Sequence, residues 1–236
     1  MAFTPYEISL CLHDSKRTRM WKTAIESVVK PGDVVIDAGS GTGILAVFAA
    51  LAGAARVYCI ELHPRFVTLI ENLAARNGLS DKLIVIHGDA TKVDIPEQAD
   101  VLISELLCTG LFFEPQIQVV NHLSQFLKPD GNIIPRRVRS HVQLLDAQEI
   151  LYGVRIDCDS RSHVYDDDEP VSTQVQYDDL EMRANMPLKV ENTVEVTALR
   201  TGVADAVKIE GEAELAKDMW TTTTKFLFNP EVIFLK

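Results

Sequence analysis

The chain contains 236 residues, of which 47% are hydrophobic and 24% are charged, and its formal net charge at pH 7 is −11. The apolar fraction excludes a disordered chain, and the length is sufficient for one large domain or two modest domains with a buried core. The acidic balance argues against a broad interface with nucleic acid. No stretch approaches the roughly 20 apolar residues of a membrane-spanning helix, so we expect no membrane partner.

The cysteines and the N-terminus indicate the cellular compartment. The four cysteines are scattered and form no CxxC pair. The first residues do not show a basic segment followed by an apolar one, as a secretory signal does. We therefore expect a reduced, cytoplasmic protein without a metal site.

Charge and composition both change near Pro135. Residues 1–137 contain 13 basic and 15 acidic residues, whereas residues 139–236 contain 10 basic and 19 acidic ones. Short β-rich runs alternate with Ala/Leu-rich runs in the first part, and Val/Thr-rich alternating segments dominate the second. We therefore predict two domains, residues 1–136 and residues 137–236.

The first domain is predicted to alternate strands with helices. The expected strands are 33–37, 56–61, 82–87, 99–105 and 132–134, and the expected helices are 44–51, 63–77 and 117–127. This order predicts a Rossmann-like, doubly wound parallel α/β sheet. Ligands of such sheets bind beyond the carboxyl ends of the strands, where Glu61, Asp89 and Glu105 are expected.

The second domain is predicted to be smaller and β-rich. Alternating segments predict strands at 139–145, 190–196 and 206–215, and a final hairpin is expected from 221–228 and 232–235. Alternation places one face of each strand in the core and the other in solvent. Glu210, Glu212 and Glu214 are expected on the solvent face, either simply solvated or as a docking surface for a basic partner.

A glycine-rich loop lies between the first strand and the first helix of the sheet. It reads Gly39-Ser40-Gly41-Thr42-Gly43 and follows Asp37, and Glu61 comes 22 residues after Gly39. Glycines allow a ligand to approach the backbone closely, and a helix N-terminus offers free N–H groups. The Glu61 carboxylate can accept both hydroxyls of a ribose. NAD would satisfy much of this pattern.

The GxGxG pattern after an acid, with a second acid after the third strand, resembles class I S-adenosylmethionine-dependent methyltransferases. Gly88-Asp89-Ala90 fits the family's adenine-contacting turn, and residues 127–131 fit its turn before a late strand. The resemblance covers roughly residues 32–135. It implies S-adenosylmethionine as cofactor and S-adenosylhomocysteine as product. The cofactor residues that it implies, together with Arg17 from the segment described next, are Asp37, Gly39, Ser40, Gly41, Gly43, Glu61, Leu62, Asp89 and Ala90.

Two further segments resemble the protein arginine methyltransferases. Residues 104–114 resemble that family's double-glutamate hairpin, with Glu105 and Glu114 nine positions apart. The segment from Asp14 to Ile25 resembles its D-x-x-R-T-x-x-Y-x-x-A-I pattern, with Trp21 in place of tyrosine. The resemblance implies that Glu105 and Glu114 are catalytic and hold the acceptor guanidinium, and that Arg17 meets the carboxylate of the cofactor.

The chain also departs from the arginine methyltransferase pattern. Only Phe3 and Tyr6 are available for the family's pair of aromatic residues on the helix that covers the cofactor. The Thr-His-Trp loop is absent, and Trp220 with the following threonines is its nearest counterpart. The β-rich part is short for the family's barrel and dimerisation arm.

We therefore expect a methyltransferase that N-methylates a guanidinium group, on a protein arginine or on a small guanidine compound. The expected partners are a basic protein or such a compound, and a homodimer is possible. One alternative is a methyltransferase acting on another protein or small-molecule nucleophile. The other is a non-catalytic Rossmann-like module that binds a partner through its acidic β-rich domain.

Overall fold

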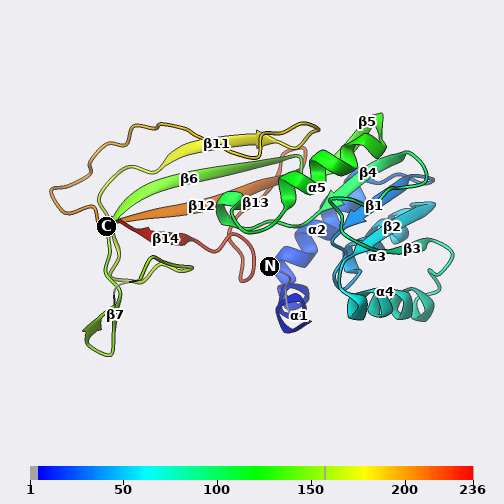
Figure 1. The fold of residues 1–236 in the computed structure, drawn as a ribbon, viewed down its shortest axis with the longest axis horizontal. Coiled ribbons are helices and arrows are strands. Elements are labelled where there is room, and N and C mark those ends of the chain that lie inside the picture. The colour runs from blue at the N-terminus through cyan, green and yellow to red at the C-terminus, as the bar shows by residue number, and fades with distance from the viewer. Residues whose placement is uncertain (1–4, 157, 236) are drawn as a thin grey trace.

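The computed structural model describes residues 5–156 and 158–235, which form two sheets side by side (Figure 1). The helices are α1 (Pro5–His13), α2 (Ser15–Val28), α3 (Ile44–Ala52), α4 (Pro64–Arg76) and α5 (Gln116–Leu123), with 3-10 turns η1 (Thr109–Leu111) and η2 (Ser124–Phe126). The strands of the first sheet are β1 (Val34–Ala38), β2 (Arg56–Glu61), β3 (Leu83–His87), β4 (Ala99–Ser104) and β5 (Leu127–Ile134). The remaining strands are β6 (Arg137–Asp146), β7 (Ile150–Leu151), β8 (Val154–Arg155), β9 (Ser160–Arg161), β10 (Glu169–Pro170), β11 (Val175–Glu181), β12 (Ala206–Ala216), β13 (Met219–Thr221) and β14 (Glu231–Phe234).

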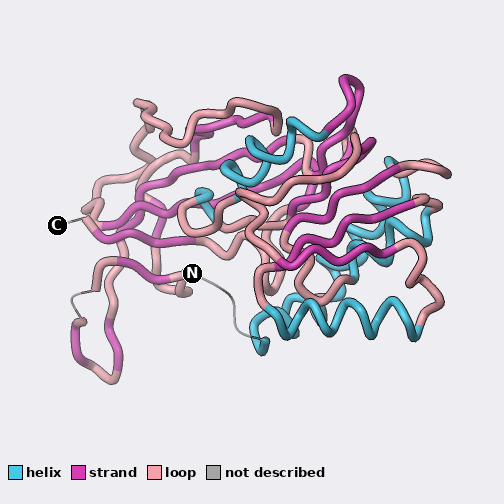
Figure 2. The backbone as a smooth tube through the Cα atoms, turned by 45° about the vertical axis from the view of Figure 1, so that its right-hand side comes forward, coloured by secondary structure: helices cyan, strands magenta, loops and turns pink. Residues whose placement is uncertain are grey.

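The first sheet is parallel and has the order β3-β2-β1-β4-β5. Every residue of the central strand β1 is buried, as its β-branched sequence requires when helices cover both faces of a sheet. The chain reverses direction across the sheet between β1 and β4, which creates a switch point at their carboxyl ends. Figure 2 shows the helices packed around these strands. The predicted Rossmann-like, doubly wound fold is confirmed.

The second sheet is antiparallel and is built on two long strands. β6 and β12 pair from Leu145 and Ala206 at one end to Arg137 and Glu214 at the other. At this second end, Leu215 and Phe228 belong to the same apolar core as the parallel sheet. The two sheets therefore share one core at their junction, and the predicted division into residues 1–136 and 137–236 stays a prediction.

Two expectations for the β-rich part are wrong. Residues 190–196 form no strand: the segment is mostly exposed, and its contact with β11 is a side-chain hydrogen bond from Asn192 Nδ2 to Tyr177 O at 2.6 Å, not a ladder of backbone bonds. The expected final hairpin is also absent from the described chain. β13 and β14 both pair with β12 instead, and residues 222–230 form a loop that turns toward the first sheet.

The acidic side chains of β12 form ion pairs with basic side chains of the same chain. Arg136 Nη1 lies 3.1 Å from Glu214 Oε1, Arg139 Nη1 lies 3.6 Å from Glu212 Oε1, and Lys208 Nζ lies 3.2 Å from Glu210 Oε2. Glu214 was expected in solvent but is only 8% exposed. The face that was expected to offer free negative charge is thus largely neutralised within the fold.

No helix in the described ranges has the length and apolar character needed to cross a membrane.

Candidate functional site

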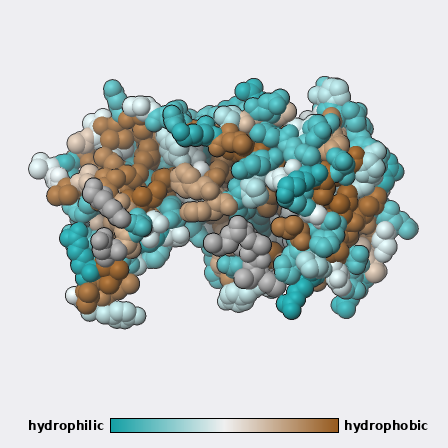
Figure 3. Space-filling model, viewed as in Figure 1, coloured by the Kyte–Doolittle hydropathy of each residue, from teal (hydrophilic) through white to brown (hydrophobic). Residues whose placement is uncertain are grey.

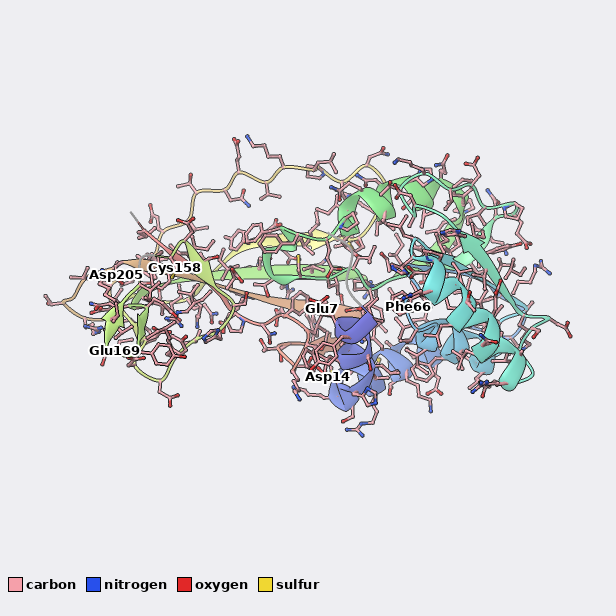
Figure 4. All side chains as sticks on the ribbon, turned by 60° about the horizontal axis from the view of Figure 1, so that its bottom comes forward. Glu7, Asp14, Phe66, Cys158, Glu169 and Asp205 are labelled. Atoms are coloured by element: carbon pink, nitrogen blue, oxygen red, sulfur yellow. The ribbon has the colours of Figure 1, made fainter. Side chains whose placement is uncertain are left out.

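A cavity of about 680 Å³ lies at the carboxyl ends of the parallel strands, next to the junction of the two sheets. Its walls come from α1, α2, the glycine-rich loop, the ends of β2 and β3, the loop after β4 and the loop before β14. Figure 4 labels Glu7 on α1 and Phe66 on α4, which line this cavity. Cys158, Glu169 and Asp205 gather at the far end of the antiparallel sheet, away from it.

The glycine-rich loop folds back over β2 and leaves its backbone facing the cavity. The N–H groups of Gly39 and Ser40 both donate to Ile60 O, at 3.0 and 2.9 Å. Gly39 has a φ of +71°, and a Cβ there would lie 2.8 Å from Leu106 Cδ2. A side chain at this position would therefore have a strained backbone and would displace the Leu106 side chain.

Gly43 has a different position from the other loop glycines. It does not line the cavity but caps α3 with a φ of +78°, and a Cβ there would lie 3.1 Å from Ile70 Cγ1. We attribute this glycine to helix start and close packing on α4, and not to ligand contact.

Glu61 is buried at the end of β2 and lines the cavity. Its Oε2 accepts from Gly41 N and its Oε1 accepts from His63 N, both at 2.8 Å. These two bonds fix the carboxylate and leave further lone pairs for a diol. Leu62, the next residue, is exposed and offers an apolar surface along the same wall.

Asp89 and Ala90 form the cavity wall that follows β3. The Asp89 Oδ1 accepts from Thr91 N at 2.9 Å and Thr91 Oγ1 at 2.7 Å, and Lys92 Nζ lies 3.0 Å from Oδ2. These hydrogen bonds lower the pKa of Asp89 to about 2. The turn is therefore held in a fixed, negatively charged form.

Asp37 lies behind the cavity wall and not on it. It is almost completely buried, and its Oδ2 has no hydrogen-bond partner among the described residues. Burial raises its pKa to about 7, and the neighbouring Glu61 carboxylate adds to the effect. Such an unsatisfied buried carboxylate is uncommon away from a ligand or water.

Arg17 and Glu105 come from distant segments and form an ion pair at the cavity. Arg17 Nε donates to Glu105 Oε1 at 3.3 Å, Nη2 contacts Glu105 Oε2, and Nη1 donates to Cys11 O at 3.3 Å. The resemblance implied that Arg17 meets the carboxylate of the cofactor. In the structure its partner is Glu105, so the two implied sites are directly connected.

Glu114 lies across the same loop and also lines the cavity. Within residues 5–156 and 158–235, no donor is hydrogen-bonded to its carboxylate. Burial raises the pKa of Glu114 to about 7, although Arg17 opposes the effect. The loop is held at its base by Gln116, whose Oε1 accepts from Ser104 Oγ at 3.0 Å and Leu106 N at 3.1 Å.

Several residues that line the cavity were not predicted from the sequence. Phe226, Phe228 and Asn229 line the cavity from the loop before β14, and Glu231 lines it from the start of that strand. Trp220 packs under the Arg139 guanidinium and does not line the cavity. α1 contributes Glu7, Ile8, Leu10, Cys11 and Leu12. Of the expected aromatic pair, Tyr6 is exposed outside the cavity lining, and Phe3 lies outside the described residues.

Asp14 connects α2 to the loop before β14. Its carboxylate caps α2 by accepting from Arg17 N, and it also accepts from Thr224 Oγ1 at 2.5 Å and from Phe226 N at 3.0 Å. The D-x-x-R pattern contained this residue, but only the fold shows its contact over more than 200 positions.

The site fits S-adenosylmethionine. Gly39, Ser40 and Gly41 line the cavity, Glu61 beside them has lone pairs for a ribose diol, and the buried Asp37 behind this wall has an unsatisfied oxygen. Residues 14–136 match the family described as ribosomal protein L11 methyltransferase (PrmA). The chain belongs to this methyltransferase family. The expected S-adenosylmethionine-dependent methyltransferase, with S-adenosylhomocysteine as product, is confirmed.

Other proteins similar to this methyltransferase are also known. An uncharacterised protein of Methanocaldococcus jannaschii is 38% identical over 191 residues, which cover 78% of this chain and 68% of that one. The arginine N(omega)-methyltransferase of Streptomyces achromogenes subsp. streptozoticus is 37% identical over 145 residues, 59% of this chain and 40% of that one. A solved Trypanosoma brucei PRMT1 enzyme-prozyme heterotetrameric complex with AdoHcy shares the fold, with a TM-score of 0.75, 20% identity and coverage of 95% of this chain and 80% of that one.

None of the groups of His, Cys, Asp and Glu side chains in the described part of the methyltransferase could hold a metal ion with three or more ligands.

Proposed function

We propose that this methyltransferase transfers a methyl group to a terminal nitrogen of a guanidinium, on a protein arginine or on a small guanidine compound. The main support is the position of Glu105 and Glu114, which line one cavity together with the glycine-rich loop and Glu61. The arginine named in the Streptomyces relative points the same way. Because the chain spans only 40% of that relative, the acceptor is proposed here on the site's chemistry.

The guanidinium is a planar cation with five N–H donors, and two carboxylates can bind it while leaving the attacking nitrogen oriented. Glu105 would bind it from a position fixed by Arg17, and Glu114 from the opposite side of the loop. Bound S-adenosylmethionine supplies an activated methyl group on a sulfonium. The attacking nitrogen gains that methyl and loses one proton, which a carboxylate with the raised pKa of Glu114 can accept.

For the cofactor we propose that Glu61 binds the ribose, that the turn at Asp89 and Ala90 contacts the adenine, and that Leu62 packs along it. Gly39, Ser40 and Gly41 would lie against the amino-acid portion of the cofactor. Asp37 would contribute to this part of the site from its buried position behind the loop. Arg17 would bind the cofactor carboxylate while keeping its bond to Glu105, since a guanidinium has donors for both.

Methyl transfer to a panel of acceptors tests this proposal. We expect transfer from S-adenosylmethionine to arginine peptides or small guanidines, and a loss of at least about 100-fold in kcat/KM for Glu105→Gln and Glu114→Gln. Glu212→Gln, which removes an acid outside the cavity, is the matched control. Transfer to an amine or carboxylate that neither cavity variant affects would favour another nucleophile. Cofactor binding without turnover on any acceptor would favour a non-catalytic module.

We also propose that the protein forms a homodimer. The β7–β8 hairpin projects from the antiparallel sheet (Figure 1), and hydrophobic atoms gather on it in Figure 3. Ile150, Leu151, Tyr152, Val154 and Ile156 are all exposed there. Contiguous apolar exposure of this kind is typical of an interface. Sedimentation of the wild type should show a dimer that Leu151→Asp with Tyr152→Asp disrupts, and a wild-type monomer at micromolar concentration would contradict it.

The expected cytoplasmic location stays a prediction.

A further inference from the structure

The reaction cavity extends past the two glutamates of the β4 loop to a wall built by the antiparallel sheet. Ser162, which follows β9, and Glu231, which begins β14, form part of this wall. The two strands are paired, with Val232 opposite Arg161. This wall comes from the antiparallel sheet, whereas the glycine-rich loop belongs to the parallel one.

Glu231 is a buried carboxylate with little to balance its charge. It is 8% exposed, and its Oε2 accepts from Ser162 Oγ at 2.8 Å. In the chain as described, this hydroxyl is the one hydrogen-bond donor to Glu231, and no base lies within ion-pair distance. A buried carboxylate with a single neutral donor is costly unless a cation joins it.

The cavity offers no cation of its own for Glu231. Among the described residues that line it, the basic ones are Arg17 and His63. Arg17 is bound to Glu105, and His63 belongs to the wall that follows β2. A cationic group of a bound ligand could therefore pair with Glu231 without competing with a base of the cavity lining.

Glu231 is also close to the loop that would bind the guanidinium. Thr109 Oγ1 donates to Asn229 O at 2.6 Å, which ties the middle of that loop to the segment before β14. Two residues of extended chain span roughly 7 Å, so the Glu231 backbone lies within that distance of this contact. Glu114 and Glu231 also line the same cavity.

We propose that Glu231 is a second cation subsite, which selects a small guanidine acceptor that also has an amino group and no carboxylate. This inference rests on the proposed function and adds the substrate class. Glu231 would bind the ammonium end while Glu105 and Glu114 bind the guanidinium end. A carboxylate beside the amine, as in free arginine, would be repelled by Glu231 and by the other acids of the cavity.

Binding measurements separate this subsite from the guanidinium site. Calorimetry with S-adenosylhomocysteine present would compare agmatine (4-aminobutylguanidine) with butylguanidine, which lacks the amine, and with free arginine. We expect the wild type to bind agmatine about tenfold more tightly than either. Glu231→Gln should reduce the preference over butylguanidine to about twofold or less. Glu212→Gln should keep the full preference, and Glu114→Gln should weaken both guanidines.

Three other results would contradict the second subsite, the proposed function or the choice of a small acceptor. Equal wild-type affinity for agmatine and butylguanidine, with both weakened by Glu114→Gln, removes the second subsite and leaves the proposed function intact. No binding of any guanidine removes both. If a lysine-flanked arginine peptide shows the preference that depends on Glu231 and agmatine does not, the assignment to a small acceptor is wrong. The wild-type comparison decides the question even if Glu231→Gln does not fold.

Discussion

The Glu114 carboxylate is partly buried in the cavity wall, where its ionised form is disfavoured. This burial affects both activity and stability. Its pKa is raised to about 7 by loss of solvent, and no donor among the described residues compensates the carboxylate. A bound guanidinium would supply that compensation. The residue is therefore expected to cost stability in the free protein and to gain its partner only from the acceptor.

The first prediction concerns the pH dependence of activity. The kcat/KM for a guanidine acceptor should rise with pH along a limb with an apparent pKa near 7, because only ionised Glu114 binds the cation. Steady-state rates between pH 5.5 and 9 at saturating cofactor measure it. A flat profile over this range, with chemistry rate-limiting, would contradict the assignment of Glu114.

The second prediction concerns stability. Because the folded-state pKa of Glu114 lies above its unfolded value near 4.3, the folded protein binds more protons between these values, and stability falls as pH rises through them. Glu114→Gln stays neutral and should be more stable than the wild type at pH 8.5, by up to about 3 kcal/mol, with little difference at pH 4. Urea unfolding at both pH values tests this. A variant that is less stable at pH 8.5 would show that Glu114 is compensated.

The third prediction concerns Glu61. Glu61→Ala removes the acceptor for Gly41 N and His63 N as well as the proposed ribose ligand, so S-adenosylhomocysteine affinity should fall about 10- to 100-fold. Calorimetry measures the loss, and Glu212→Gln is the control. Unchanged affinity would place the cofactor elsewhere in the cavity.

Site residues that belong to a local sequence motif could be predicted from the sequence. Site residues that reach the cavity only through long-range contacts could not. The glycine-rich loop, Glu61 and Asp89 follow from strand ends and turn chemistry within a short stretch of sequence. Asn229 contacts the loop after β4 from 120 positions away, and nothing in its own neighbourhood indicates that contact. Glu231 lines the cavity for the same reason, since it follows Asn229 closely in the chain.

At the level of elements, the start of α2 joins the two sheets. Asp14 caps this helix and also accepts bonds from Thr224 and Phe226 of the loop before β14. The helix cap and the wall of the acceptor cavity therefore depend on one carboxylate. Arg17 lies one turn further along the same helix and contacts Glu105.

The fourth prediction tests this connection. Asp14→Ala should lower the free energy of unfolding by about 2–3 kcal/mol, because it removes a helix cap and leaves buried donors without a partner. Asp14→Asn keeps one accepting oxygen and should lose less. Urea unfolding compares the two. Equal stability of Asp14→Ala and the wild type would contradict the role of this carboxylate.

Alternating sequence predicted strands only where a neighbour was available. β6 and β12 pair with each other along nearly their whole length, and both were expected. Residues 190–196 alternate as clearly but are mostly exposed, and they meet β11 through the Asn192 side chain and not through a ladder of backbone bonds. Pairing partners are a property of the whole fold, so the pattern within one segment could not distinguish these cases.

At the scale of the whole molecule, the net charge of −11 has two different consequences. The acids of β12 are paired with Arg136, Arg139 and Lys208 of the same chain. Six acids line the cavity: Glu7, Glu61, Asp89, Glu105, Glu114 and Glu231. Among the described residues, Glu114 and Glu231 have no basic partner within ion-pair distance, whereas Glu105 is bound to Arg17. Acids outnumber bases among the described residues that line the cavity, where the basic ones are Arg17 and His63, and this balance favours a cationic acceptor.

The most direct test of this account is methyl transfer from labelled S-adenosylmethionine to a guanidine acceptor, with product nitrogen identified by mass spectrometry. The account predicts methylation of a terminal guanidinium nitrogen by the wild type and by Glu212→Gln, and a loss of at least about 100-fold for Glu105→Gln and Glu114→Gln. Methylation of a different group that persists in both of these variants would contradict it.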